Sequence, residues 1–285
     1  MHSRDYDSVI AGHYRKEALL HGLSPTCTME DRAIREKETS AIVRFVDQSL
    51  RVRRSMGVGG PATIMDVGCG NGYTMHVLTS HFRDATLIGF EQTPELLELA
   101  RSRFEGADNI SVMEADIRID EFSAGVQADV LISQRVLINI MDVDDQVLAL
   151  RNVVRAMKPP AEGILGGRAL FIESFATPLD NLNRARGELD LPPLKPAYHN
   201  LYLKDGFFET ADLKPIEWDR DEFAPNFLST HYFIARVIHP LLKSDRSISR
   251  NSELVNFFVG ALNRNIGDYS PLKAYAYERI QTSCD

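Results

Sequence analysis

The stretch Ile64-Met65-Asp66-Val67-Gly68-Cys69-Gly70-Asn71-Gly72 decides the fold. An apolar run that ends in an acid predicts a buried strand, and the alternating glycines predict a tight turn into the stretch that follows at 73–78. Glycine has no Cβ, so the backbone of such a turn can approach a ligand closely and adopt positive φ. A helix that begins near Asn71 would present free N–H groups and a partial positive charge to an anionic group.

Two further apolar runs also end in acids. Residues 87–90 lead to Glu91, and residues 110–113 lead to Glu114 and Asp116. Ligands of open α/β sheets lie beyond the carboxyl ends of the strands, so these acids and Asp66 predict a ligand with an amine, a ribose and a purine. The main alternative is a nicotinamide dinucleotide site, whose Gly-x-Gly-x-x-Gly pattern would need its third glycine at Tyr73. A pyrophosphate would meet a side chain there, which favours a ligand without phosphate.

These motifs resemble those of class I S-adenosylmethionine-dependent methyltransferases, over roughly residues 61–175. The resemblance implies S-adenosylmethionine as the cofactor, a ribose-binding role for Glu91 and an adenine-binding role for Asp116. Asp66 is expected to shape the glycine loop or to receive the amino group. The cofactor-binding residues expected in all are Asp66, Gly68, Cys69, Gly70, Gly72, Glu91, Gln92, Asp116, Ile117 and Gln134.

Predicted strands and helices alternate along the chain, which indicates βαβ units and an α/β fold. Strands are expected near 62–67, 85–91, 110–115, 128–133, 168–174, 214–222 and 272–280. Helices are expected near 5–22, 29–54, 72–82, 94–105, 143–157, 226–243 and 251–265, with Thr28 as the N-cap of the second. The resemblance implies a Rossmann-like sheet of seven mostly parallel strands, the last antiparallel, with helices on both faces.

This pattern divides the chain into four parts. Residues 1–60 are expected to form an N-terminal helical lid, and residues 61–175 the S-adenosylmethionine-binding core. A proline-rich and partly irregular insertion after the fifth strand, residues 176–213, is expected to cap the substrate. Residues 214–285 are expected to complete the core with further strands and inserted helices.

Composition limits the partners. The chain has 285 residues, of which 44% are hydrophobic, and a net charge of −8 at pH 7. This acidic balance argues against a nucleic-acid substrate, which usually calls for a basic face. No apolar run approaches ~18 residues and no signal-peptide pattern is present, so no membrane span is expected and a cytoplasmic location is the default. Three cysteines without metal-ligand spacing fit a reducing compartment, and no metal site is expected, although dispersed Asp and His residues could still meet in space. A homodimer through the insertion or the N-terminal helices is an open alternative.

The segment after the fourth strand begins with Gln134-Arg135, and in the family this segment faces the methyl group. It lacks the Asp/Asn-Pro-Pro-aromatic signature of DNA amino-methyltransferases. Arg135 could bind a carboxylate or phosphate of the substrate, or it could be a surface or capping arginine. Glu173, at the end of the fifth strand, is expected to be a base or hydroxyl ligand, or else a partner of Arg135 that holds the loops together.

The insertion carries Tyr198-His199-Asn200-Leu201-Tyr202, a composition typical of binding loops. His199 has a near-neutral reference pKa and is the best candidate for a general base, although it could simply hydrogen-bond the backbone of an irregular loop. On the helix expected at 226–243, Tyr232 could face the pocket, whereas His231 is expected to be structural. The catalytic candidates are therefore His199, Glu173 and Arg135, and the substrate-binding candidates are Tyr14, Tyr198, Asn200, Tyr202 and Tyr232.

A looser similarity covers most of the chain. Thr28-Met29-x-Asp31 with Arg35, and the segments 199–202 and 267–271, are similar to those of bacterial methyltransferases, some encoded among polysaccharide genes. The sequence thus predicts methyl transfer to a polar small molecule, with a hydroxyl of a sugar or natural product as the first expectation. The alternatives are N-methylation, carboxyl methylation and a non-catalytic S-adenosylmethionine-binding protein.

Overall fold

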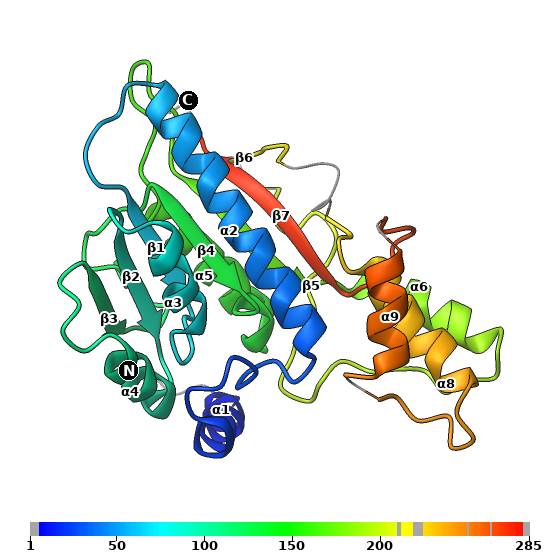
Figure 1. Cartoon of the computed structure of the whole chain (residues 1–285). Coiled ribbons are helices and arrows are strands. Elements are labelled where there is room, and N and C mark those ends of the chain that lie inside the picture. Colours follow the sequence, from blue (N-terminus) through cyan, green and yellow to red (C-terminus); the bar gives the residue numbers. More distant parts are fainter. Residues whose placement is uncertain (1–5, 210–211, 219–224, 250, 263, 282–285) are drawn as a thin grey trace.

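A seven-stranded sheet in the order β3-β2-β1-β4-β5-β7-β6 forms the centre of the protein (Figure 1). The computed structural model describes residues 6–209, 212–218, 225–249, 251–262 and 264–281. Strands β1 to β5 are parallel, and β7 runs antiparallel to both β5 and β6. The predicted seven-stranded, mostly parallel sheet with an antiparallel last strand is confirmed. The strands are β1 (Thr63–Val67), β2 (Thr86–Glu91), β3 (Ile110–Glu114), β4 (Val130–Gln134), β5 (Arg168–Ser174), β6 (Leu213–Pro215) and β7 (Leu272–Arg279).

Helices cover both faces of this sheet. They are α1 (Asp7–His21), α2 (Arg32–Ser55), α3 (Tyr73–His81), α4 (Pro94–Arg103), α5 (Val143–Arg155), α6 (Ala176–Gly187), α7 (Ser229–Phe233), α8 (His239–Leu241) and α9 (Glu253–Ala261). A 3₁₀ turn, η1 (Leu137–Asn139), follows β4, and a π-helical turn, η2 (Ile234–Ile238), joins α7 to α8. In the described part of the chain, none of these helices is long and apolar enough to span a bilayer.

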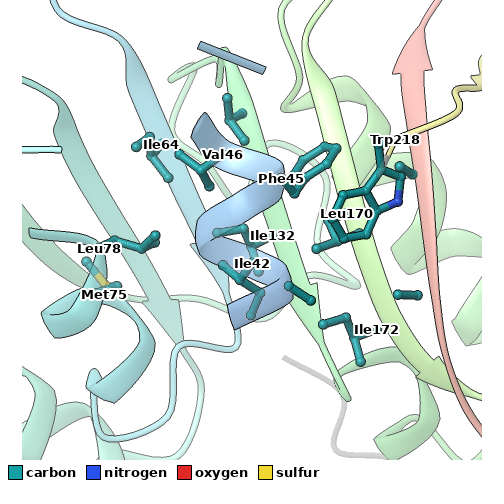
Figure 2. Packing of buried hydrophobic residues seen from close by; sticks show 14 of the residues in the cluster. Ile42, Phe45, Val46, Ile64, Met75, Leu78, Ile132, Leu170, Ile172 and Trp218 are labelled. Atoms are coloured by element: carbon teal, nitrogen blue, oxygen red, sulfur yellow. The ribbon is translucent and has the colours of Figure 1, made fainter. Parts of the chain in front are cut away.

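Alternate residues of each strand enter two separate cores, as the period of two in a strand requires. On one face, Ile64 of β1 and Ile132 of β4 pack with Ile42 and Phe45 of α2 (Figure 2). On the other face, Met65 and Leu131 belong to a core that α5 and the segment around Phe208 complete. The sheet is thus covered on both sides, which explains why its central strands are apolar throughout.

Two predictions need correction, and a third gains detail. Helix α2 is a core helix that lies along the sheet, so only α1 of the expected N-terminal lid lies over the strand ends (Figures 1 and 2). The N-cap of α2 is Asp31 rather than Thr28. The Asp31 carboxylate accepts the Ile34 N–H. The insertion begins with the regular helix α6, which tolerates Pro178 because a first-turn proline breaks no helical hydrogen bond.

The C-terminal part also differs in detail. The strand expected near 214–222 is the short β6, and residues 219–222 of that prediction lie outside the described residues. The helix expected at 226–243 is divided into α7, η2 and α8, and the helix expected at 251–265 is α9.

Strand order reverses at β1, because β2 pairs with one of its edges and β4 with the other. The connections therefore leave β1 and β4 on opposite sides, and a crevice forms beyond the carboxyl ends of these two strands. This topological switch point is where open α/β sheets bind their ligands.

Candidate active site

A cavity of about 230 Å³ lies at this switch point, closed on its outer side by α1. Asp7 and Tyr14 of α1 and its N-cap, Tyr6, contribute to the wall of this cavity. The residues expected from the sequence that line it are Tyr14, Asp66, Gly68, Cys69, Gly70, Glu91, Gln92, Asp116, Ile117, Gln134 and Arg135. The strand-end acids therefore meet around one space, as the order of the strands predicts.

The glycine turn brings the backbone of β1 to this cavity. Gly68 and Gly70 have φ of 68° and 59°, in the left-handed region that favours glycine. A Cβ on Gly68 would lie 2.5 Å from a methyl group of Val136, so packing also excludes a side chain at this position. Gly72 differs from the prediction because it is the N-cap of α3 and packs against Phe104 and Ala100, outside the cavity wall.

Asp66 is a buried carboxylate in this wall. Its Oδ2 has no hydrogen-bond partner among the described residues, and burial raises the pKa of the carboxyl to about 7. The guanidinium of Arg35, which also lines the cavity, opposes this rise. Because buried polar atoms are nearly always paired, an orphaned carboxylate oxygen indicates a missing donor, and an ammonium group fits it.

Glu91 is held by the backbone. Its two carboxylate oxygens accept the N–H of Gly70 at 2.9 Å and the N–H of Thr93 at 2.8 Å. Burial raises the pKa of Glu91, and these backbone donors oppose the rise. Each oxygen keeps a second lone pair, so the carboxylate can still accept hydrogen bonds from ligand hydroxyls.

Asp116 ties helix α1 to the sheet. Both of its oxygens accept hydrogen bonds from the guanidinium of Arg118, at 2.7 to 3.1 Å. Another arm of Arg118 donates to Asp7 at 2.6 Å and to the Tyr6 hydroxyl at 3.0 Å. The expected adenine-binding acid thus also anchors the start of α1 through Arg118.

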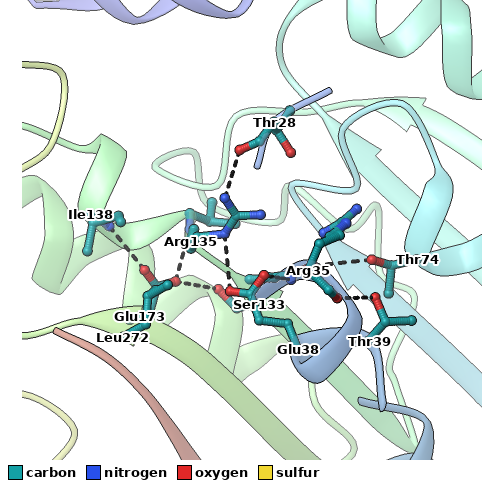
Figure 3. Close-up of polar contacts among 12 residues, drawn as sticks. Thr28, Arg35, Glu38, Thr39, Thr74, Ser133, Arg135, Ile138, Glu173 and Leu272 are labelled. Carbon is teal, nitrogen blue, oxygen red and sulfur yellow. Dashed lines mark hydrogen bonds and ion pairs between the residues drawn. The ribbon is translucent and has the colours of Figure 1, made fainter. Parts of the chain in front are cut away.

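A polar chain links the cavity to the buried face of α2 (Figure 3). The Gln134 side-chain oxygen accepts from Arg35 at 2.9 Å and from Thr74 at 3.2 Å, and its amide donates to Glu38 at 2.8 Å. Glu38 is fully buried and lies 3.4 Å from the Nε of Arg135. Arg135 has φ of 58°, and its Nη1 donates to the Thr28 carbonyl at 2.8 Å.

Glu173 is not placed as a base. Its carboxylate is fully buried and accepts the Ser133 hydroxyl and the N–H groups of Val136, Leu137 and Ile138, at 3.0 to 3.3 Å (Figure 3). Burial raises its pKa to about 7 against these donors. Glu173 therefore shapes the loop after β4, as the second interpretation held, but it acts through backbone N–H groups, whereas Arg135 pairs with Glu38.

His199 does not line the cavity either. Its ring stacks on His13 of α1 with 3.7 Å between centroids, and Tyr198, which is 67% exposed, contacts His13 at 3.2 Å. Burial, with the nearby His13, lowers the pKa of His199 to about 4, so the imidazole is neutral at pH 7. Asn200 lies one layer behind the cavity and donates to Asn139, which donates in turn to the Tyr14 hydroxyl. The insertion thus holds α1 in place through these contacts.

The other two substrate-binding candidates also lie outside the cavity wall. Tyr202 hydrogen-bonds Ser174, and burial raises its pKa. Tyr232 lies under the Arg236 guanidinium, 4.7 Å from its carbon, and burial raises its pKa too. His231 is buried and contacts Asp31 at 3.1 Å, in a structural position.

Three residues of the site were not singled out from the sequence. Asn139 and Arg118 lie in loops after strand ends, and only the fold brings Arg118 to Asp7. Glu38 did leave a signal, because it lies four residues from both Ile34 and Ile42 on the apolar face of α2. A carboxylate at such a position has to find a partner on burial.

The cavity wall fits S-adenosylmethionine on its own chemistry. The orphaned Asp66 oxygen suits the amino group, and the Arg35 guanidinium suits the carboxylate of the methionine part. Glu91 keeps acceptor capacity for ribose hydroxyls, and Asp116 with the Ile117 backbone lies where the purine would be expected. Among the residues that the structure describes, no group of three or more His, Cys, Asp or Glu side chains could hold a metal ion.

Comparison with known proteins gives a consistent result. Residues 61–166 match a family described as "Methyltransferase domain". Two solved structures align over nearly the whole chain. Magnesium protoporphyrin IX methyltransferase from Synechocystis, with bound SAH, shares 11% identity over 95% of this chain and 99% of that chain, with a TM-score of 0.50. A methyltransferase in complex with the Haloferax volcanii Trm112 activator shares 14% over 99% and 100%, with a TM-score of 0.51.

A third structure shares more identity over less of the chain. CalS10, an amino pentose methyltransferase from Micromonospora echinaspora, shares 22% identity over 60% of this chain, with a TM-score of 0.36. The chain spans only 58% of that protein's length. At these identities the structural likenesses show the fold, while the family match carries the type of domain. The family match identifies a methyltransferase domain in residues 61–166, and the strand order shows a Rossmann-like fold.

Proposed function

We propose that the protein transfers the methyl group of S-adenosylmethionine to a polar small molecule. The observation that carries this proposal is the cavity itself, which is closed by α1 and polar on the side of Gln134, Arg135 and Asn139. A small recessed pocket suits a small acceptor better than a protein surface or a duplex. The net charge of −8 also argues against nucleic acid.

In this proposal, the residues of the cavity act mainly by positioning. Asp66, Arg35 and Glu91 hold the ends of the cofactor, which supplies an electrophilic methyl group on a sulfonium. Arg135, Asn139 and Tyr14 orient the acceptor, and burial keeps the Tyr14 pKa at about 12, so its hydroxyl remains a donor. Holding two reactants in line can supply ~7–11 kcal/mol of the barrier, so no further catalytic group is required for a reactive acceptor.

The position of His199 changes which acceptor atom fits best. No histidine is present among the described residues that line the cavity, and the carboxylates there belong to the cofactor half. An alcohol would need a base, whereas a carboxylate or a neutral amine attacks without losing a proton first. We therefore place a carboxylate oxygen or an amine ahead of the hydroxyl expected from the sequence. Arg135 favours the carboxylate, since a guanidinium binds this group in a bidentate manner.

The test is transfer of labelled methyl from S-adenosylmethionine into a fractionated extract of the source organism. Label in a low-mass fraction that mild base releases as methanol would indicate a methyl ester, and base-stable label would indicate an amine or ether. A rate that increases with pH through the pKa of an amine would separate the last two. Label in protein or nucleic acid would contradict the small-molecule proposal. Tight cofactor binding without any transfer would favour a non-catalytic binding protein.

A further inference from the structure

Helix α9 presents an apolar face to solvent at the end of the molecule farthest from β3 (Figure 1). Its inner side, Val255 and Val259, packs on Ile234 and Ala235 of η2. Its outer side leaves Phe257 69% exposed and Phe258 42% exposed. The α9 face, as we define it, consists of the exposed side chains Ile238, Leu241, Leu242, Leu254, Phe257, Phe258, Leu262 and Ile266. A helix that is apolar all round is normally buried, so this face calls for a covering surface.

The size of the α9 face points to a protein interface. The exposed fractions of its side chains correspond to several hundred Å² of apolar area in contact with water, which is comparable to the largest patch on a typical monomer, ~300–600 Å² and often functional. A stable interface buries about 800 Å² on each partner, so the α9 face with a polar rim is large enough for one.

The spacing of its residues fits a second helix of the same kind. Leu254, Phe257, Phe258 and Ala261 follow the i, i+3, i+4, i+7 pattern of a helix-packing seam, and Ala261 is small enough for close approach. In a two-fold interface the same surface meets itself. An axis through the middle of α9 makes the two helices antiparallel, so Glu253 at the start of one helix approaches Arg264 beyond the end of the other.

This end-to-end charge complementarity is what a self-interface needs. Glu253 and Arg264 are both exposed, and the two-fold axis would create the pair twice. The net charge of −8 weighs against an anionic membrane as the occupant of the face.

We propose that the protein forms a two-fold homodimer in which the α9 face packs against the α9 face of a second copy. This surface differs from the insertion and N-terminal helices that the sequence suggested. It leaves the cavity and α1 outside the interface, so each copy keeps its own site.

The test measures the dimer dissociation constant by sedimentation equilibrium over a wide concentration range. We expect Phe257→Asp to weaken the dimer by about 100-fold or more, since central aromatic residues dominate interfaces. Ile164→Asp, which changes an exposed apolar residue in the loop before β5, should leave the constant unchanged. Because Phe257 is largely exposed, circular dichroism should show the same fold in both variants.

A charge exchange tests the two-fold geometry. Glu253→Arg and Arg264→Glu should each weaken the dimer several-fold, because each places like charges together at both ends of the seam. The double variant should regain the affinity of the original protein. The proposal would be overturned if the protein were monomeric at every concentration. It would also be overturned if the effects of the two single variants simply added in the double variant. Binding to anionic vesicles that Phe257→Asp abolishes, with a monomeric protein, would assign the face to a membrane and also overturn it.

Discussion

At the scale of a single residue, Asp66 links cofactor binding to pH. Its carboxyl is buried beside the cavity with a pKa of about 7, and an ammonium partner needs the ionised form. We expect Asp66→Asn to weaken S-adenosylmethionine binding about 10- to 100-fold, since a hydrogen bond between charged groups is worth ~1.5–3 kcal/mol. In the original protein the affinity should fall as the pH drops below 7, whereas in Asp66→Asn it should be nearly independent of pH. Isothermal titration calorimetry between pH 5 and 8 measures both.

The same substitution has an opposite effect on stability. Burial raises the folded-state pKa above the unfolded value of about 3.9, so the carboxyl favours folding only when it is protonated, and this contribution is lost as the pH rises through 7. Without cofactor, Asp66→Asn should therefore be more stable than the original protein at pH 8, with a smaller difference at pH 5. Equal affinity for both proteins at pH 8 would contradict the role of Asp66 as the partner of the amino group.

Gly68 shows how backbone conformation and packing act together at one position. A side chain there would be strained at φ of 68° and would also overlap Val136. We expect Gly68→Ala to lower the free energy of unfolding by about 2–4 kcal/mol, the sum of the left-handed strain and the overlap. Gly57→Ala is the matched control, because its φ is 74° but no atom lies within 4 Å of the added Cβ. Urea denaturation should give about 1–2 kcal/mol for this control. Adding Val136→Ala to Gly68→Ala should recover the difference in unfolding free energy between Gly68→Ala and Gly57→Ala. A lack of recovery would remove the steric explanation.

At the scale of an element, α1 covers the cavity with little burial of its own. Ala18 is its only buried residue among those described, and its other ties include polar contacts of Tyr6, Asp7 and Tyr14 and the stacking of His13 on His199. Removal of residues 1–21 should therefore leave the melting temperature of the cofactor-free protein within a few degrees. The cofactor should dissociate much faster, by tenfold or more, because a charged arm of Arg118 and one wall of the cavity are released. Stopped-flow measurement of cofactor release tests this, with Tyr6→Phe/Asp7→Asn as the milder variant. An unchanged rate would show that α1 is not the barrier to release.

Local sequence patterns predict the strands and the glycine turn, but they do not predict how the loops of the acceptor half pack. The strands and the turn at Gly68 follow from periodicity and glycine spacing, so the residues expected to bind the cofactor line one cavity, except Gly72, which caps α3. The acceptor half depends on loops packed by contacts distant in sequence. Local composition made His199 attractive as a base, but its position is decided by stacking on His13, 186 residues earlier in the chain. The burial of α2 was readable from its apolar pattern, yet the likeness to lid helices outweighed it.

At the scale of the whole molecule, Asp31 joins the start of α2 to the C-terminal helices. It caps α2, and its Oδ2 contacts His231 at 3.1 Å and Arg236 at 3.5 Å in a buried cluster. These partners and the Ile34 N–H lower its pKa to about 2 against the effect of burial. A depressed folded-state pKa means that Asp31 stabilises the fold above its unfolded value of about 3.9 and that this contribution is lost as the pH falls toward 2.

We expect Asp31→Ala to lower the free energy of unfolding at pH 7 by about 3–5 kcal/mol, since it leaves a buried cation without its partner. Asp142→Ala is the matched control, because Asp142 caps α5 through the Asp145 N–H at an exposed position. Loss of a cap alone should cost about 1 kcal/mol. Urea denaturation of both variants at pH 7 gives the comparison. Because Asp31 joins segments about 200 residues apart, its loss should also loosen the C-terminal helices before the sheet unfolds. Hydrogen exchange should then be faster in α7 and α9 than in β4. Similar losses in the two variants would mean that Asp31 is only a helix cap, and that the C-terminal helices are held to the sheet by apolar packing alone.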